Sequence, residues 1–215
     1  MVIPYIHKIT KISSFDVKSS EMKTFEDVVE FHGHSCPGLA LGYRLSVFAL
    51  KQLGDRAADE ELVAIVENSS CAVDALQVVT GCTFGKGNLI FRDYGKQVYT
   101  FTKRPSDEGI RISVDWKSPE ETKEEKRMWE RYMNGDQSEE VLKKIHNRKS
   151  KKIDIILNSG DEELFRVIRG KMDLPEEARI YKSMTCAVCE EKMMEPRARV
   201  KDGQIVCIPC FENND

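Results

Sequence analysis

Seven cysteines and a pair of closely spaced histidines are the side chains of this sequence best suited to metal or redox chemistry. The most specific spacing lies near the C-terminus, where two Cys-x2-Cys pairs are separated by seventeen residues. Two residues between thiolates let both sulfurs reach one tetrahedral ion, and this overall spacing is typical of structural zinc sites. The sequence therefore predicts a zinc site at Cys186, Cys189, Cys207 and Cys210.

The residues between these pairs predict a hairpin that turns at Asp202–Gly203 and brings the pairs together. A segment of this size buries too little apolar surface to fold alone, so a metal is expected to hold it. Two alternatives stay open: a redox-active Cys-x2-Cys pair, and a carboxylate in place of Cys210.

A second group of candidate ligands lies in FHGHSCPG, residues 31–38, where His32, His34 and Cys36 occupy every second position. In an extended segment these side chains would point to one side, and imidazole and thiolate both bind zinc. Pro37 suits the first turn of a helix, whose free N–H groups favour a thiolate at Cys36. This pattern predicts a metal pocket in the core of the protein.

Cys71 is the expected fourth ligand of that pocket, because it follows a predicted strand and begins a predicted helix. Cys82 lies beyond the same helix, about 15 Å from Cys71 at 1.5 Å per residue, so it is expected to be dispensable. Asp74 is one turn into the helix and is the candidate hydrogen-bond acceptor for a ligand histidine, an ordinary first-turn carboxylate being the alternative.

Hydrophobic periodicity predicts the elements that position these residues. Glycine-rich residues 80–88 lack the spacing of a phosphate-binding loop and are expected to form a tight turn. The expected elements are helices at 23–31, 37–54 and 71–79, strands at 61–68 and 109–116, and a hairpin at 89–103 turning at Gly95–Lys96.

Residues 117–152 are rich in charge and predict solvated helices at 118–133 and 138–152, the first with a capping box of Ser118 and Glu121. A partner-binding basic end at 143–152 is the alternative. A strand at 152–157, a helix at 160–171 and a domain boundary at Pro175 are expected to follow, giving domains 1–175 and 176–215.

The composition and net charge of the chain argue against some classes of binding partner. The chain has 215 residues, of which 40% are hydrophobic and 32% charged, with a formal net charge of −3. This charge gives no general attraction to nucleic acids or anionic membranes, and residues 176–215 are also more acidic than basic. Residues 1–20 show no export signal, so we expect a cytoplasmic protein that binds neither nucleic acid nor membrane.

Three stretches, FHGHSCPGLALGYR, CAVDALQVVTGCTFGKGNL and DYGK, resemble the FmdE family of formylmethanofuran dehydrogenase proteins, and residues 178–210 resemble its zinc-finger extension. The resemblance implies an α+β core, with a mixed β-sheet flanked by helices, and a treble-clef or ribbon-like zinc domain. It also implies a metal-capable core pocket, onto which His32, His34, Cys36 and Cys71 map. The family is linked to a molybdenum or tungsten enzyme of methanogenesis, whose pterin and redox centres lie on other subunits.

Three functions follow as hypotheses. The first is an accessory or catalytic zinc metalloprotein with two metal sites, acting in one-carbon or redox metabolism as an oxidoreductase subunit or alone. The second is a non-enzymatic adaptor that docks a protein partner, and the third is thiol redox chemistry at Cys36, Cys71 and Cys82. The small residues Gly38 and Gly42 predict close helix packing, within the chain or across a homodimer.

Overall fold

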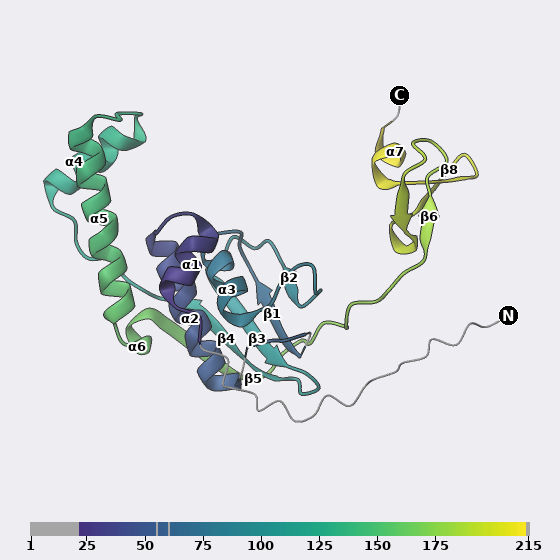
Figure 1. The fold of residues 1–215 in the computed structure, drawn as a ribbon, viewed down its shortest axis with the longest axis horizontal. Coiled ribbons are helices and arrows are strands. Elements are labelled where there is room, and N and C mark those ends of the chain that lie inside the picture. The colour runs from purple at the N-terminus through teal and green to yellow at the C-terminus, as the bar shows by residue number, and fades with distance from the viewer. Residues whose placement is uncertain (1–21, 55, 60, 214–215) are drawn as a thin grey trace. The chain divides into compact units, whose positions relative to one another are not determined.

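The computed structural model describes residues 22–54, 56–59 and 61–213 (Figure 1). The expectation about an export signal concerns residues 1–20, which lie outside the described residues. No helix in the described part of the chain is long and apolar enough to cross a membrane. The chain divides after Pro175 into two compact units, and each is described by itself.

The first unit is built on a five-stranded mixed sheet with the order β2-β1-β3-β4-β5. The neighbours β1 and β2 are parallel, and all other neighbouring pairs are antiparallel. This arrangement confirms the predicted α+β class with a mixed sheet. The strands are β1 (Leu62–Val66), β2 (Leu89–Phe91), β3 (Val98–Lys103), β4 (Glu108–Val114) and β5 (Phe165–Lys171).

Three helices pack with this sheet, namely α1 (Phe25–His32), α2 (Pro37–Leu53) and α3 (Ala72–Thr80) (Figure 1). Helix α1 begins at a capping box formed by Thr24 and Asp27, and α2 begins with Pro37 in its first turn. Alternate side chains of the strands and the apolar faces of the helices form one core. Its fully buried members include Leu39, Leu45, Leu76, Tyr99 and Phe101.

Helices α2 and α3 approach each other closely at Gly42. A Cβ atom at this position would lie 2.4 Å from the Cα of Ala72, a distance that side chains do not tolerate. The small residue that suggested close helix packing is therefore used within the chain. Because α3 also carries Cys71 at its N-cap, this contact sets the distance between the starts of the two helices.

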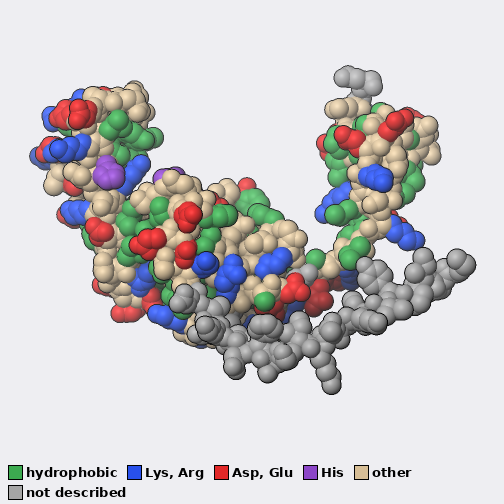
Figure 2. Space-filling model, viewed as in Figure 1, with side chains coloured by type: hydrophobic (Ala, Val, Ile, Leu, Met, Phe, Trp, Pro, Cys, Tyr) green, Lys and Arg blue, Asp and Glu red, His purple; other side chains and the backbone are tan. Residues whose placement is uncertain are grey.

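A helical hairpin of α4 (Lys123–Met133) and α5 (Glu139–Asn158) completes this unit, and its far end extends beyond the sheet. It has a small core of its own, in which Met128, Val141 and Ile145 are buried. Acidic and basic side chains are interspersed over its surface (Figure 2), as expected for solvated helices. The α2 residue Arg44 donates to the carbonyl oxygens of Ile156, Leu157 and Ser159 at the end of α5.

The chain returns from the hairpin directly to the sheet through α6 (Asp161–Leu164). Val114, the last residue of β4, pairs with Phe165, the first residue of β5. The Asp115 N–H donates to the Leu164 carbonyl at 2.9 Å, so residues 115–164 leave and re-enter the sheet at one place.

Two predicted elements after the charged segment were wrong. Residues 152–157 belong to α5 rather than to a strand, because Ile153 and Ile156 are spaced to bury one helical face in the main core. Residues 165–171 form β5 rather than a helix. They alternate between the two faces of the sheet and pair with β4 over seven residues.

The predicted hairpin at 89–103 was also wrong. Strand β2 pairs with β1 in parallel, and β1 lies between β2 and β3, so residues 92–97 form a crossing loop. The start of the first charged helix was predicted too early as well. Thr122 and Glu125 form the capping box of α4, in place of Ser118 and Glu121.

The second unit consists of two small hairpins followed by a short helix. Asp202 and Gly203, with φ of 51° and 76°, form the tight turn that the sequence predicted between two strands. The first cysteine pair lies in the turn of the first hairpin and the second pair lies at the start of the helix, which is a treble-clef-like arrangement. Its elements are β6 (Ser183–Thr185), β7 (Lys192–Met194), η1 (Glu195–Arg197), β8 (Arg199–Lys201), β9 (Gln204–Val206) and α7 (Ile208–Glu212).

Candidate metal centres and the adjoining cavity

The four C-terminal cysteines converge as the sequence predicted. Their sulfur atoms all lie within 4.8 Å of one another. The first pair lies in the turn after β6, and the second pair lies at the start of α7. The turn is held by the Cys186 N–H, which donates to the Glu191 carbonyl, and by the Ala187 N–H, which donates to the Ile205 carbonyl on β9, both at 2.9 Å.

The protonation of these sulfurs is uneven. N–H groups of Cys189, Cys207 and Val188 lower the pKa of Cys186 to about 6. The hydrogen bond with the Cys207 thiol raises the pKa of Cys210 to about 12. Four sulfurs at this separation cannot all be thiolates without a cation among them, whereas a tetrahedral zinc ion requires that donor set.

A second group of donors lies in the first unit. One ring nitrogen of His32 and the sulfurs of Cys36 and Cys71 all lie within 4.8 Å of one another. His32 is the last residue of α1, Cys36 is the N-cap of α2, and Cys71 is the N-cap of α3. Three helix ends therefore meet here, and the Leu39 N–H donates to the Cys36 sulfur at 3.3 Å.

The extended conformation expected for residues 32–36 was wrong. These residues do not form a segment with alternating side chains, because His32 lies in α1 and Gly33 turns the chain with a φ of 89°. The imidazole of His34 is exposed, and its ring centroid lies 4.5 Å from that of His32. Among the described residues His34 is not one of the converging donors, so its role as a ligand stays a prediction.

The hydrogen bonds of His32 fit a metal ligand. Its Nδ1 lies 2.7 Å from the Asp74 Oδ2, and since a carboxylate accepts, the ring proton is assigned to Nδ1. Its Nε2 is buried and has no hydrogen-bond partner within the described residues. A buried nitrogen without a partner destabilises the folded protein unless it binds a ligand. The free lone pair of Nε2 is what a zinc ligand requires.

The two other core cysteines differ in their surroundings. Burial, followed by the hydrogen bond and charge of Cys36, raises the pKa of the Cys71 thiol. Cys82 lies at the other end of α3, is fully buried and donates to the Leu62 carbonyl at 3.3 Å. Burial raises the pKa of Cys82 to about 11, and Cys82 belongs to neither converging group of the described residues.

A cavity of about 460 Å³ adjoins the core donors, in the size range of small-molecule sites. His32, Cys71 and Asp74 lie on its wall. The cavity lies at the carboxyl ends of β1 and β2, which are joined by α3. Ligands of open α/β sheets commonly bind at this kind of position.

Some wall residues were not identified from the sequence. Asn68 accepts from the Ser70 N–H at 3.0 Å and from the Ser70 hydroxyl at 2.6 Å, which orders the loop just before Cys71. The polar residues after the strand at 61–68 were a turn signal that could have pointed to this loop. Phe84 and Phe91 also line the cavity, but only the tertiary structure brings them there.

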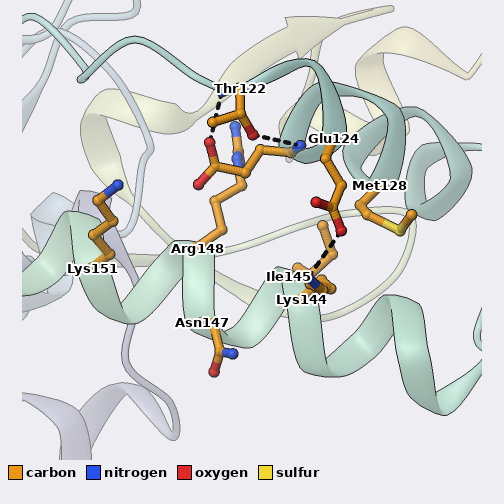
Figure 3. Close-up of a pocket in the computed structure, with 9 residues that line it drawn as sticks. Thr122, Glu124, Met128, Lys144, Ile145, Asn147, Arg148 and Lys151 are labelled. Carbon is orange, nitrogen blue, oxygen red and sulfur yellow. Dashed lines mark hydrogen bonds and ion pairs between the residues drawn. The ribbon is translucent and has the colours of Figure 1, made fainter.

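A second hollow, of about 290 Å³, lies between α4 and α5 (Figure 3). The figure shows that Lys144 pairs with Glu124 on the other helix, and that the second bonded pair, with Thr122, lies within the start of α4. Lys144 donates to Glu124 at 2.9 Å, and the Thr122 N–H donates to Glu125 at 2.7 Å. The Lys144–Glu124 ion pair thus joins the two helices, and the other bond caps α4, which favours a structural role for this hollow.

Comparison with known families agrees with this geometry. The family described as "FmdE, Molybdenum formylmethanofuran dehydrogenase operon" matches residues 31–166, more than half of the chain. The chain belongs to the FmdE family. A second match, the prokaryotic dksA/traR C4-type zinc finger, covers residues 179–213, so the C-terminal unit of this FmdE protein is a zinc finger. Both matches confirm the resemblance noted in the sequence.

Two known proteins resemble this FmdE chain over most of its length. A probable S-adenosyl-L-methionine-binding protein of Archaeoglobus fulgidus is 35% identical over 189 residues, which are 84% of this chain and 50% of the relative. The chain thus spans about half the length of that relative. The crystal structure of a tungsten formylmethanofuran dehydrogenase FmdE-like protein from Syntrophus aciditrophicus has a TM-score of 0.59 at 24% identity, covering 88% of this chain and 93% of that one. The similarity to this crystal structure supports the fold described above.

Proposed function

We propose that this protein is a zinc metalloprotein whose core centre acts on a small molecule held in the adjoining cavity. The observation that carries the proposal is a set of three converging donors, from His32, Cys36 and Cys71, beside a cavity of ligand size. Structural zinc sites have four protein ligands, whereas catalytic sites usually have three and keep a position open. The operon in the family description supports a place in one-carbon or redox metabolism.

Each side chain at this centre has a separate role. His32 Nε2 and the two sulfurs would hold Zn²⁺, which when bound polarises a carbonyl group or activates water. Asp74 accepts the Nδ1 proton of His32 and so keeps the Nε2 lone pair free for the ion. The N–H of Leu39 stabilises negative charge on the Cys36 sulfur.

A non-enzymatic adaptor is the second candidate. It is favoured by apolar side chains that the zinc finger exposes, because Val188 is 62% and Val200 69% accessible. Apolar side chains that form a contiguous exposed patch are typical of surfaces that contact proteins. If the protein is an adaptor, the core metal is structural, and His34 would complete a closed set of four core ligands.

Zinc content of the purified full-length chain, measured by mass spectrometry of the metal, tests the proposal. We expect about two zinc ions per chain in the wild type, and about one in Cys36→Ser and Cys71→Ser. Cys82→Ser, in which the altered cysteine lies beyond α3, is the matched control and should keep both. Loss of one ion from Cys82→Ser but not from Cys71→Ser would contradict the ligand set.

His34→Ala separates the two candidate functions. If the core centre is open, this variant keeps its zinc. If His34→Ala loses the core ion as completely as Cys71→Ser does, the shell is closed and the adaptor is favoured.

A further inference from the structure

We infer that the core cavity binds an uncharged or cationic molecule with a flat aromatic or heteroaromatic ring, which contacts Phe84 and Phe91. The inference rests on the proposed function, since it names the class of molecule that the metal centre would receive. It depends on different residues from those of the metal centre.

The apolar wall of the cavity is the first observation. Two aromatic side chains on this wall, Phe84 and Phe91, are 61% and 43% accessible to solvent, and neither belongs to the main core. They come from different parts of the chain, the loop after α3 and strand β2, and Val66 and Val73 line the same cavity. Aromatic rings on a cavity wall gain most from a second aromatic ring, through offset or edge-to-face contacts.

The charge of the cavity wall is the second observation. Asp74 is the one carboxylate among its described lining residues, and none of them is lysine or arginine. The two thiolates would balance the charge of a zinc ion, so the metal adds no excess positive charge that would attract an anion. A phosphorylated or carboxylate-bearing ring would lie beside Asp74 without a counter-ion. The cavity therefore discriminates against anions.

The polar group of Gln77 is the third observation. Gln77 lies one turn after Asp74 on α3, and its amide makes a single long hydrogen bond, 3.5 Å to the Asp74 Oδ1, within the described structure. The amide oxygen of Gln77 therefore stays available. By contrast, the Asn68 amide is engaged with the Lys96 carbonyl and Ser70. Gln77 would pair with an amide or a ring nitrogen of the bound molecule.

Calorimetric titration of the zinc-loaded full-length protein with two pairs of probes tests this inference. Benzamide and cyclohexanecarboxamide share an amide but differ in the flat ring, and benzamide should bind more tightly, with a dissociation constant in the millimolar range. 4-(Aminomethyl)benzamide and 4-carbamoylbenzoate share the ring and the amide but differ in the charge at the far end. The cation should bind about tenfold more tightly than the anion.

Variants locate the binding site. Phe84→Ala and Phe91→Ala should each weaken benzamide binding by roughly two- to tenfold, while folding is kept because neither ring is part of the main core. Tyr94→Ala removes an aromatic ring that is about as exposed as Phe84 but does not line the cavity, so it is the control and should bind as the wild type does.

The outcomes separate this inference from the proposed function. Absence of benzamide binding, equal effects of Phe91→Ala and Tyr94→Ala, or a preference for the anionic probe overturns the inference, while the zinc contents of the cysteine variants can still support the metal centre. Conversely, benzamide binding to a Cys71→Ser protein that keeps all of its zinc supports the aromatic pocket and contradicts the metal centre.

Discussion

Identical side chains at the two ends of α3 have different chemistry because their surroundings differ. Cys71, at the N-cap, faces another thiol, an imidazole and a cavity. Cys82, after the helix, has no accessible surface and donates to a backbone carbonyl. The sequence could separate these cysteines because one helix fixes the distance between them. It could not assign Phe84 to the cavity, since that depends on how the loop after α3 folds back.

Burial of Cys82 predicts a loss of stability at alkaline pH. Its pKa is about 11 in the folded protein, against an ordinary value of 9.0, so the folded state binds the proton more tightly than the unfolded state. The stabilisation is complete below about pH 9 and is lost as the pH rises towards 11, about 2–3 kcal/mol in all.

Urea unfolding at pH 7.5 and pH 10.5 measures this effect. The free energy of unfolding of Cys82→Ala should fall less between these pH values than that of the wild type, because other groups that titrate in this range are common to both proteins. An equal fall in both proteins would show that Cys82 is not the group responsible.

At the scale of elements, the sequence predicted best those segments whose local pattern agrees with their tertiary partner. The helix at 37–54 begins at Pro37 in the structure as expected. The isoleucines of residues 152–157 favoured a strand by β-propensity, but packing of Ile153 and Ile156 into the main core made this segment the end of a helix. Strand β5 was missed although Phe165 and Val167 alternate with charged Arg166, because its pairing with β4, far earlier in the chain, is set by the tertiary structure.

The contact between α2 and α3 at Gly42 makes a prediction at this scale. Gly42→Ala should destabilise the first unit by about 1–3 kcal/mol, since its Cβ would meet the backbone of Ala72 rather than a flexible side chain. The helices must separate, which should lower the zinc content of the core centre and spare that of the zinc finger. Gly85→Ala, whose Cβ would have no atom within 4 Å, is the control for urea unfolding and zinc analysis. Equal stability of the two variants would contradict this interpretation.

At the scale of the whole molecule, the two units are stabilised in different ways. The first has a continuous core formed by its sheet and helices. In the second, Cys186 and Val206 are the only buried residues of the described segment 176–213, so the metal has to supply most of the stability. The cysteine spacing was sufficient to predict this difference.

Hydrogen exchange of the full-length protein with and without a zinc chelator tests this difference. The chelator should abolish the protection of the Cys186 and Ala187 amides, which bond to Glu191 and Ile205, while amides of β1 and β3 keep theirs. Excess zinc added with the chelator should restore protection. Protection of the Ala187 amide that survives complete zinc removal would show that the finger is stable without its metal.

The pairing of Val114 with Phe165 has a consequence for how this fold can vary. Antiparallel neighbours need only a tight turn to join them, so residues 115–164 are an excursion between two strands that are already adjacent. The entropy of closing such a loop grows only with the logarithm of its length. Relatives can therefore lengthen, shorten or exchange α4 and the start of α5 without shifting the register of the sheet, whereas the end of α5 buries Ile153 and Ile156 in the main core and has to be kept. This segment is accordingly the natural place for lineage-specific insertions, and the first to consider when a foreign module is grafted into the chain.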